Sequence, residues 1–285
     1  MGEENIHLVS LGKAEFSYGV IFGYYQGDNK EKQIHYTVDI AFVPQGSHYL
    51  LTLSKDKVYY NNEGADLISE QFSEAVGKSL FPLELEVSRQ MELISLLNTY
   101  KIEERWKQQR AFLKKYYIGK IAEKVFSLMD EAYSHSAHIR QIIKKNLFFD
   151  LYFFPAIYRE VKEEVRFNIY PFIPPITYTL NERKTDKSRS GKIRVSLKGN
   201  CTDTRSWASI ENKDRIFIPA RQQELIGSLD LQYKLDESSG LLYSLIGSLS
   251  VGISKKEKRK IEVEIYKLNR QVTKMETITS RFADT

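Results

Sequence analysis

The chain has 285 residues, 42% of them hydrophobic and 28% charged, which is the balance of a globular protein and excludes a disordered one. Its length allows one large β-rich domain. The formal net charge of +5 is small for this length. It argues against a general nucleic-acid binder, which usually gathers a stronger basic bias on one face.

The N-terminal sequence and the apolar runs predict a cytoplasmic protein. Residues 1–5 (MGEEN) lack the basic and apolar regions of a secretory signal. The longest apolar runs, such as Leu147–Ile157, are too short and too interrupted to span a bilayer. The single cysteine, Cys201, excludes an internal disulfide. We therefore expect a reducing compartment and no membrane span.

The first third of the chain alternates like sheet. A strand is expected within residues 18–27, and residues 34–43 place apolar side chains on one face. After a turn, residues 48–53 return as a strand and residues 58–60 continue as another. The pattern predicts a β-meander.

The next segments mix helical and extended patterns. Residues 66–76 have the apolar spacing of a short helix. Residues 83–87 alternate strictly and residues 91–97 follow closely, which predicts a hairpin, although 91–97 could instead begin the next helix. Between residues 99 and 152 the apolar period becomes helical, which predicts three helices of roughly 12 to 18 residues with a break at Gly119.

Sheet patterns resume after residue 160. Strands are expected at 165–170, 176–180 and 192–197, with residues 181–191 as a polar hairpin loop. The clearest meander comes last, and its strands are 229–235, 241–251 and 261–268. The polar tail beyond residue 269 is expected to fray.

These patterns predict an α+β fold in which antiparallel β-sheets, or half-barrel meanders, flank an inserted helical segment of about three helices. The N-terminal β-rich portion covers residues 1–98, the helical insert 99–158 and the C-terminal antiparallel meander 159–285. We expect the three portions to form one composite domain.

No motif supports catalysis, since the sequence has no phosphate-binding loop, nucleophile elbow or zinc-protease motif. We therefore expect a non-catalytic protein without a cofactor. Cys201 lies in a polar connection with weak support for activation, and we interpret it as unreactive. Glu131, His135 and His138 would share one face of a continuous helix and could converge on a metal ion, whereas the serines beside His135 favour a helix break.

Two basic segments could form a patch for an acidic partner or nucleic acid if they met in space. Alternatively they are charged tips of hairpin loops, where charge protects against edge pairing. Their basic residues are Arg183, Lys184, Lys187, Arg189, Lys192, Lys255, Lys256, Lys258, Arg259 and Lys260.

An aromatic cluster precedes Pro155. Its simplest role is to dock the helices onto the sheet as core. It has more aromatic rings than one helix face needs, so part of it could instead line a groove for a partner segment or a lipid tail. The cluster consists of Phe148, Phe149, Tyr152, Phe153 and Phe154.

Several stretches carry a family resemblance. They are residues 83–87 (LELEV), 102–107 (IEERWK), 116–119 (YYIG), 146–158 (NLFFDLYFFPAIY) and the terminal meander at 233–266. The chain resembles uncharacterised cytosolic proteins of Bacteroidota, some of which are associated with contractile (type VI) secretion gene clusters. The resemblance implies an accessory, adaptor or effector-chaperone role and transfers no functional residue.

The sequence thus favours a protein-binding adaptor or chaperone-like accessory protein, of a bacterial secretion system if the resemblance holds. The alternative is a carrier that holds a lipid or other hydrophobic ligand in a groove between sheet and helices. Nucleic acid is not an expected partner.

Overall fold

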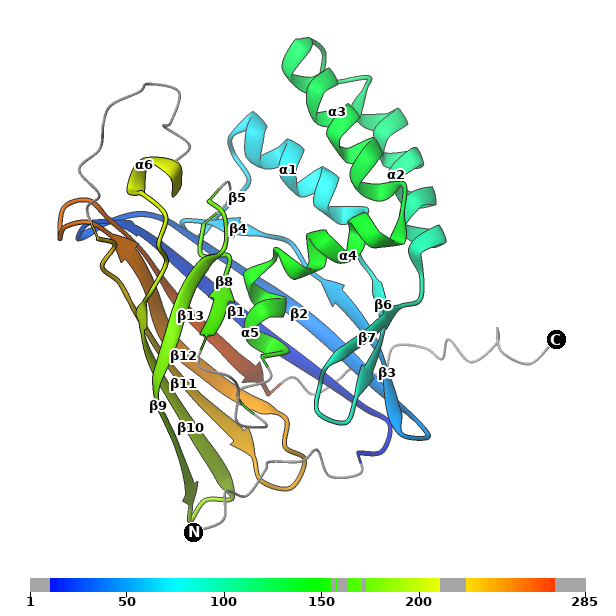
Figure 1. The fold of residues 1–285 in the computed structure, drawn as a ribbon. Coiled ribbons are helices and arrows are strands. Elements are labelled where there is room, and N and C mark those ends of the chain that lie inside the picture. The colour runs from blue at the N-terminus through cyan, green and yellow to red at the C-terminus, as the bar shows by residue number, and fades with distance from the viewer. Residues whose placement is uncertain (1–10, 155–156, 158–163, 171–172, 211–223, 270–285) are drawn as a thin grey trace.

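The computed structural model describes residues 11–154, 157, 164–170, 173–210 and 224–269. These residues form one antiparallel sheet of 13 strands, and a helical segment interrupts the chain between its two halves. The expected α+β class is therefore confirmed. Figure 1 shows that the sheet is strongly curved, with α4 and α5 on its concave side and α1, α2 and α3 beside one end.

The strands divide into two groups along the chain. The first group comprises β1 (Ala14–Gln26), β2 (Asn29–Gln45), β3 (His48–Lys55), β4 (Tyr59–Tyr60), β5 (Glu63–Gly64), β6 (Leu83–Ser88) and β7 (Leu93–Leu96). The second comprises β8 (Glu164–Phe167), β9 (Ile176–Ser188), β10 (Lys192–Cys201), β11 (Ser228–Asp236), β12 (Leu242–Gly252) and β13 (Lys258–Leu268). The helices are α1 (Ile68–Lys78), α2 (Thr99–Leu113), α3 (Lys120–Tyr133), α4 (Ser136–Lys144), α5 (Leu147–Tyr152) and α6 (Trp207–Ile210).

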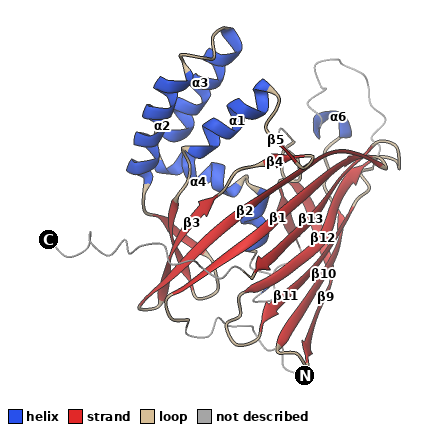
Figure 2. Ribbon diagram, turned by 180° about the vertical axis from the view of Figure 1, so that it is seen from behind, coloured by secondary structure: helices blue, strands red, loops and turns tan. Residues whose placement is uncertain are grey.

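The first and last strands join the two groups. Strand order runs β7-β6-β3-β2-β1-β13-β12-β11-β10-β9-β8, so that β1 and β13 lie in the middle. Val20 of β1 lies opposite Ile265 of β13, and Phe22 lies opposite Val263. All four side chains are buried. The apolar face of one group therefore continues into the other, and the two β portions make a single sheet (Figure 2).

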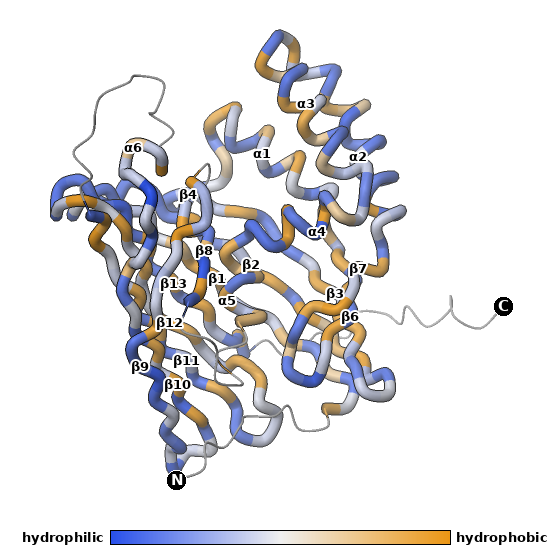
Figure 3. The backbone as a smooth tube through the Cα atoms, in the orientation of Figure 1, coloured by the Kyte–Doolittle hydropathy of each residue, from blue (hydrophilic) through white to orange (hydrophobic). Residues whose placement is uncertain are grey.

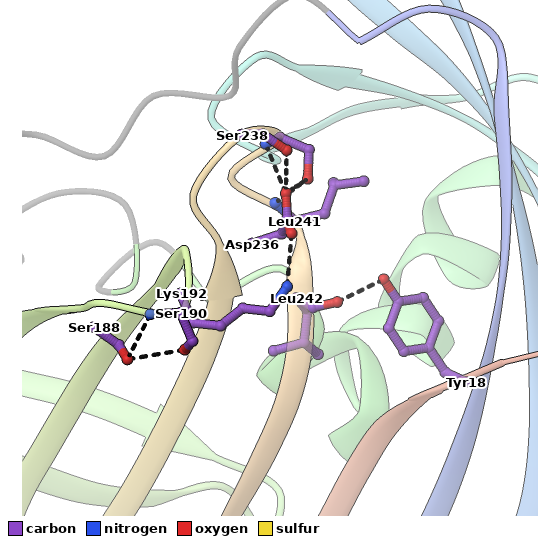
Figure 4. Close-up of polar contacts among 9 residues, drawn as sticks. Tyr18, Ser188, Ser190, Lys192, Asp236, Ser238, Leu241 and Leu242 are labelled. Atoms are coloured by element: carbon purple, nitrogen blue, oxygen red, sulfur yellow. Dashed lines mark hydrogen bonds and ion pairs between the residues drawn. The ribbon is translucent and has the colours of Figure 1, made fainter.

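Helix α5 fills the concave side of the sheet. The ring of Tyr152 packs edge-on against that of Tyr18, with centroids 5.4 Å apart. The buried tyrosine hydroxyls find backbone acceptors: Tyr18 donates to the Leu242 carbonyl oxygen at 2.9 Å (Figure 4), and Tyr233 donates to that of Leu151 at 3.3 Å. Tyrosine suits this position because its ring fills volume while its hydroxyl remains hydrogen-bonded.

Most expected strands are present, and the hairpin at 83–97 is confirmed as β6 and β7. Residues 58–60 do not extend the meander as expected. The short strand β4 pairs with Ile34 and His35 of β2, and β6 takes the place beside β3.

The prediction of a loop at 181–191 is also wrong, because β9 continues to Ser188. The short β8 pairs only with residues 176–179 of β9, so the rest of β9 is hydrogen-bonded to β10 on one side and has a free edge on the other. Charged residues are common on such edge strands.

The helical segment has one helix more than expected between residues 99 and 152. The Asn146 side-chain oxygen accepts a hydrogen bond from the Phe148 backbone N–H at 3.0 Å, which caps α5 and separates it from α4. The break at Gly119 is confirmed, and its φ of +111° is a conformation that glycine readily adopts. The expected end of the helical portion at residue 158 and the polar tail beyond 269 lie outside the described residues.

Candidate ligand-binding cavity

A cavity of about 1480 Å³ lies between the concave side of β1, β2 and β3, helix α1 and the segment that follows β8. Its volume exceeds the roughly 300–1000 Å³ that is usual for small-molecule sites. Twelve of its 26 lining residues are aromatic or aliphatic. They are Phe22, Tyr24, Ile34, Tyr36, Val58, Tyr60, Phe81, Met129, Leu147, Ile169, Tyr170 and Ile173.

The strand pattern determines the sheet side of this wall. Phe22 of β1 pairs with Ile34 of β2, and its ring lies edge-on to Tyr36 with centroids 6.2 Å apart. Tyr24, two residues along β1, packs edge-on against Tyr170 at 5.1 Å. Because residues i and i+2 of a strand share a face, β1 and β2 together present a continuous aromatic surface to the cavity.

Lys55, the last residue of β3, places a positive charge in this aromatic wall. Its ammonium nitrogen lies 4.4 Å from the centre of the Tyr36 ring and 6.0 Å from that of Phe81. Within the described part of the chain it makes no ion pair, although the more distant Glu74 favours its charged form. Burial dominates and lowers the pKa of Lys55 to about 8. Cation–π contact only partly replaces water, so an anionic ligand group would be well placed here.

The charged residues of the cavity favour an anion more generally. Lys57, Lys78 and Lys145 line it and are exposed, so they stand at its mouth. Together with Lys55 they give four positive charges against the two of Asp56 and Glu74, a net charge of +2. Glu74 already has a cationic partner in Lys78, at 3.3 Å. The cavity is therefore apolar inside and basic at its entrance.

Two tyrosine hydroxyls offer neutral polar contacts inside the cavity. Among the described residues, neither Tyr24 nor Tyr36 has a hydrogen-bond partner for its hydroxyl. Burial raises the pKa of Tyr24 to about 12 and that of Tyr36 well above its usual range. Both groups therefore stay protonated at neutral pH and can donate a hydrogen bond to a ligand.

The aromatic cluster 148–154 packs as core and does not line the cavity. Phe148 stacks on Tyr152 with ring centroids 5.4 Å apart, and Phe154 packs on Phe167 at 5.0 Å. Four of the five cluster residues are buried and only Phe153 is half-buried. The neighbouring Leu147 is the residue of α5 that reaches the cavity. The cavity therefore lies beside the cluster, against β1, β2 and β3, and its wall contains none of the five residues predicted to line a groove.

The two basic segments do not meet. The turn after β9 lies beside the β11–β12 turn, since Lys192 pairs with Asp236. The β12–β13 turn lies at the other end of the 11-residue β12, roughly 30 Å away. One basic side chain of each segment forms an ion pair with a nearby carboxylate. Lys192 contacts Asp236 at 2.7 Å (Figure 4), and Arg259 contacts Glu31 at 3.1 Å. The structure thus provides no single basic patch from both segments.

The structure interrupts the metal candidate at a helix boundary and places Cys201 at the end of a strand. His135 precedes α4 as its N-cap residue, so the continuous helix required for a metal site is broken there. The Nδ1 atom of His138 lies 2.8 Å from the Glu131 carbonyl oxygen. No group of three or more potential metal ligands occurs within the described ranges.

Cys201 is the last residue of β10 and does not lie in a connection as expected. Burial raises the pKa of its thiol.

Sequence reasoning missed the central cavity residue. The alternation at 34–43 predicts that Tyr36 lies on an apolar strand face. Nothing in the sequence marks Lys55 as a binding residue, because it follows the alternating residues 48–53 of its strand.

No protein-family model matches the chain, and no curated protein matches it significantly. The resemblance to Bacteroidota proteins therefore stays a prediction. No helix within the described residues is long and apolar enough to cross a membrane.

Proposed function

We propose that the protein is a carrier that binds an elongated amphipathic ligand with an acidic head group, such as a long-chain carboxylate. The observation that carries the proposal is the large aromatic cavity with the half-buried Lys55 in its wall. The apolar body of the ligand would lie along β1 and β2, and its carboxylate would meet the Lys55 ammonium.

The cavity offers a ligand two kinds of contact, an apolar wall and the Lys55 ammonium. Burying apolar surface stabilises the complex by about 25 cal/mol per Å² removed from water, whatever the head group. The head group adds specificity, because a charge-assisted hydrogen bond contributes about 1.5–3 kcal/mol. An uncharged alcohol of the same length would gain the first contribution and lose the second.

Binding should depend on pH through Lys55. Burial in the cavity wall lowers the pKa of Lys55 to about 8, whereas a bound carboxylate would favour the charged lysine. The lysine is therefore mostly charged at pH 7 and mostly neutral at pH 9, so carboxylate affinity should fall as the pH rises through about 8. The alcohol should show no such dependence.

The first experiment measures oleate and oleyl alcohol binding by calorimetric titration of the full chain. Lys55→Met retains an apolar stem and should weaken oleate binding by about tenfold or more while changing alcohol binding little. Lys267→Met is the matched control. Lys267 is also half-buried, with its ammonium 4.1 Å from the centre of the Phe16 ring, but it lies outside the cavity. Equal loss of both ligands in Lys55→Met would contradict the head-group assignment.

A second pair of variants tests the cavity itself. Gly77 of α1 lines the cavity, and a Cβ atom added there meets open space. Gly77→Trp should therefore occupy the part of the cavity beside α1 and weaken binding of both ligands without unfolding the protein. Gly77→Ala should bind normally. Unchanged binding in a folded Gly77→Trp protein would refute the carrier function.

The adaptor function and the absence of catalysis stay predictions. The aromatic cluster that motivated the adaptor is buried, so a protein partner would need another surface. An affinity pull-down with the full chain tests it, and recovery of a stoichiometric protein partner by both wild type and Gly77→Trp would favour the adaptor.

A further inference from the structure

The α2–α3 hairpin exposes large apolar side chains at its free end. Ile118 and Ile121 are 87% and 84% exposed, Tyr116 is 68% and Phe112 is 52% exposed. Figures 1 and 2 show this end projecting away from the sheet. We call these four residues the hairpin tip. Single exposed apolar residues are normal on protein surfaces, but a contiguous group marks an interaction site.

The tip residues contribute nothing to the hairpin's own core. Leu113 and Phe126 are buried between the helices, and Tyr117 packs on Phe72 with ring centroids 4.6 Å apart. The hairpin is therefore stabilised by side chains that point inward. The turn between its helices places Tyr116 and Ile118 outward on either side of the buried contact.

Lysines surround the hairpin tip. Residues 112–124 contain four lysines and one glutamate, a net charge of +3. Lys114 lies 3.5 Å from Glu123. Lys115, Lys120 and Lys124 are exposed and make no ion pair with any described residue. Figure 3 shows the resulting alternation of apolar and polar segments along the hairpin.

We propose that the hairpin tip docks the protein onto an anionic phospholipid surface, with the exposed isoleucines and aromatic rings inserted between head groups and the lysines on the lipid charges. A projecting apolar end flanked by lysines matches the interface of a bilayer, where apolar insertion and attraction to anionic lipids act together. The proposal is independent of the ligand cavity, which lies on other residues.

Charge complementarity favours the bilayer over a protein partner. The tip is a protrusion, so a protein partner would have to provide a deep apolar pocket with an acidic rim. A bilayer offers both features over its whole surface and needs no fixed geometry. The mixture of apolar residues with four lysines also disfavours self-association, because two copies of the tip would bring like charges together.

The test is co-sedimentation of the full chain with vesicles of phosphatidylcholine alone or with 30% phosphatidylserine (an assay choice of roughly physiological surface charge). We expect at least about tenfold tighter binding to the anionic vesicles, weakened by 0.5 M salt, an addition of about three times physiological ionic strength. Ile118→Asp combined with Ile121→Asp should reduce this binding at least about tenfold, because it removes the inserted groups and adds negative charge.

The matched control combines Ile68→Asp with Tyr100→Asp. These residues are 73% and 72% exposed and lie in the first turns of α1 and α2, where an acidic side chain suits the helix dipole. The control should bind vesicles within about twofold of wild type, which separates the tip from exposed apolar surface in general. Thermal unfolding followed by circular dichroism verifies that each variant is folded.

Three results would overturn the proposal. The first is wild-type protein that binds neither vesicle, and the second is equal binding to both vesicles without salt dependence. The third is a dimer of the wild-type chain that the tip variant dissociates, because the tip would then bind a second copy. Gly77→Trp should dock normally, so that a failure of the carrier function is distinguishable from a failure of membrane docking.

Discussion

Replacing Asp150 with asparagine should stabilise the protein at neutral pH. Asp150 lies in the first turn of α5, and the Asn168 side-chain nitrogen donates to its carboxylate at 3.2 Å. Burial raises the pKa of Asp150 from 3.8 to about 6, while the hydrogen bond from Asn168 acts in the opposite direction. The folded protein therefore carries this carboxylate charge at a cost.

The magnitude follows from the difference in pKa between folded and unfolded chains. A difference of about two units, at 1.36 kcal/mol per unit, gives about 3 kcal/mol as an upper limit. The folded state holds the proton more tightly, so the free energy of unfolding falls as the pH rises from about 4 to about 6. Above pH 6 the whole penalty is present. Asparagine has similar size and no charge, so Asp150→Asn should gain about 1–3 kcal/mol at pH 7.5.

Urea unfolding followed by circular dichroism measures this effect at pH 4.5 and 7.5. The gain of the variant over wild type should be about 1–2 kcal/mol larger at pH 7.5, where wild-type Asp150 is ionised. Comparing the two proteins at each pH removes the titration of all other groups. An equal loss of stability at both pH values would refute the reasoning, since the hydrogen bond with Asn168 would then outweigh the burial of charge.

Asp236→Asn is a control that should change the free energy of unfolding in the opposite direction, because the pKa of Asp236 is lowered in the folded protein. The Asp236 carboxylate accepts hydrogen bonds from Lys192 at 2.7 Å, from the Ser238 hydroxyl and from the Ser239 backbone N–H at 3.1 Å (Figure 4). These bonds, that from Lys192 first, hold its pKa well below the usual range. Its stabilisation is present above the unfolded pKa of 3.8 and is lost as the pH falls. The variant should therefore lose about 1–2 kcal/mol at pH 7.5 and less in acid.

Two further predictions concern the core and the single thiol. Phe148→Ala should lower the free energy of unfolding by about 3–5 kcal/mol in the same urea assay, because Phe148 is buried and packs on both Phe149 and Tyr152. A cost below about 1 kcal/mol would show that the cluster is not core. Cys201 should react with iodoacetamide at pH 7.5 at least about tenfold slower than after unfolding in guanidinium, since burial raises its pKa. Equal rates in the two states would contradict this.

The strands and their inward faces could be predicted from the sequence because alternation is a local property. Leu229, Leu231, Tyr233 and Leu235 share a face at a period of two, and all four are buried in β11. The helical segment was recognisable for the same reason. Where the local pattern was ambiguous, neighbours decided the outcome. The charged residues after Leu180 form strand rather than loop because β10 provides their hydrogen-bond partners.

The candidate site depended on contacts between residues far apart in the chain. Lys55 faces Phe81 and Tyr36 because β3 lies beside β2 and the chain after α1 returns to the same place. The pairing of β1 with β13 likewise joins residues more than two hundred positions apart. The order of strands and the volume left between sheet and helices come from packing of the whole chain, and no local period records them. The sequence alone therefore determined the elements and their apolar faces, whereas the tertiary structure decided which of those faces pack together and which enclose a cavity.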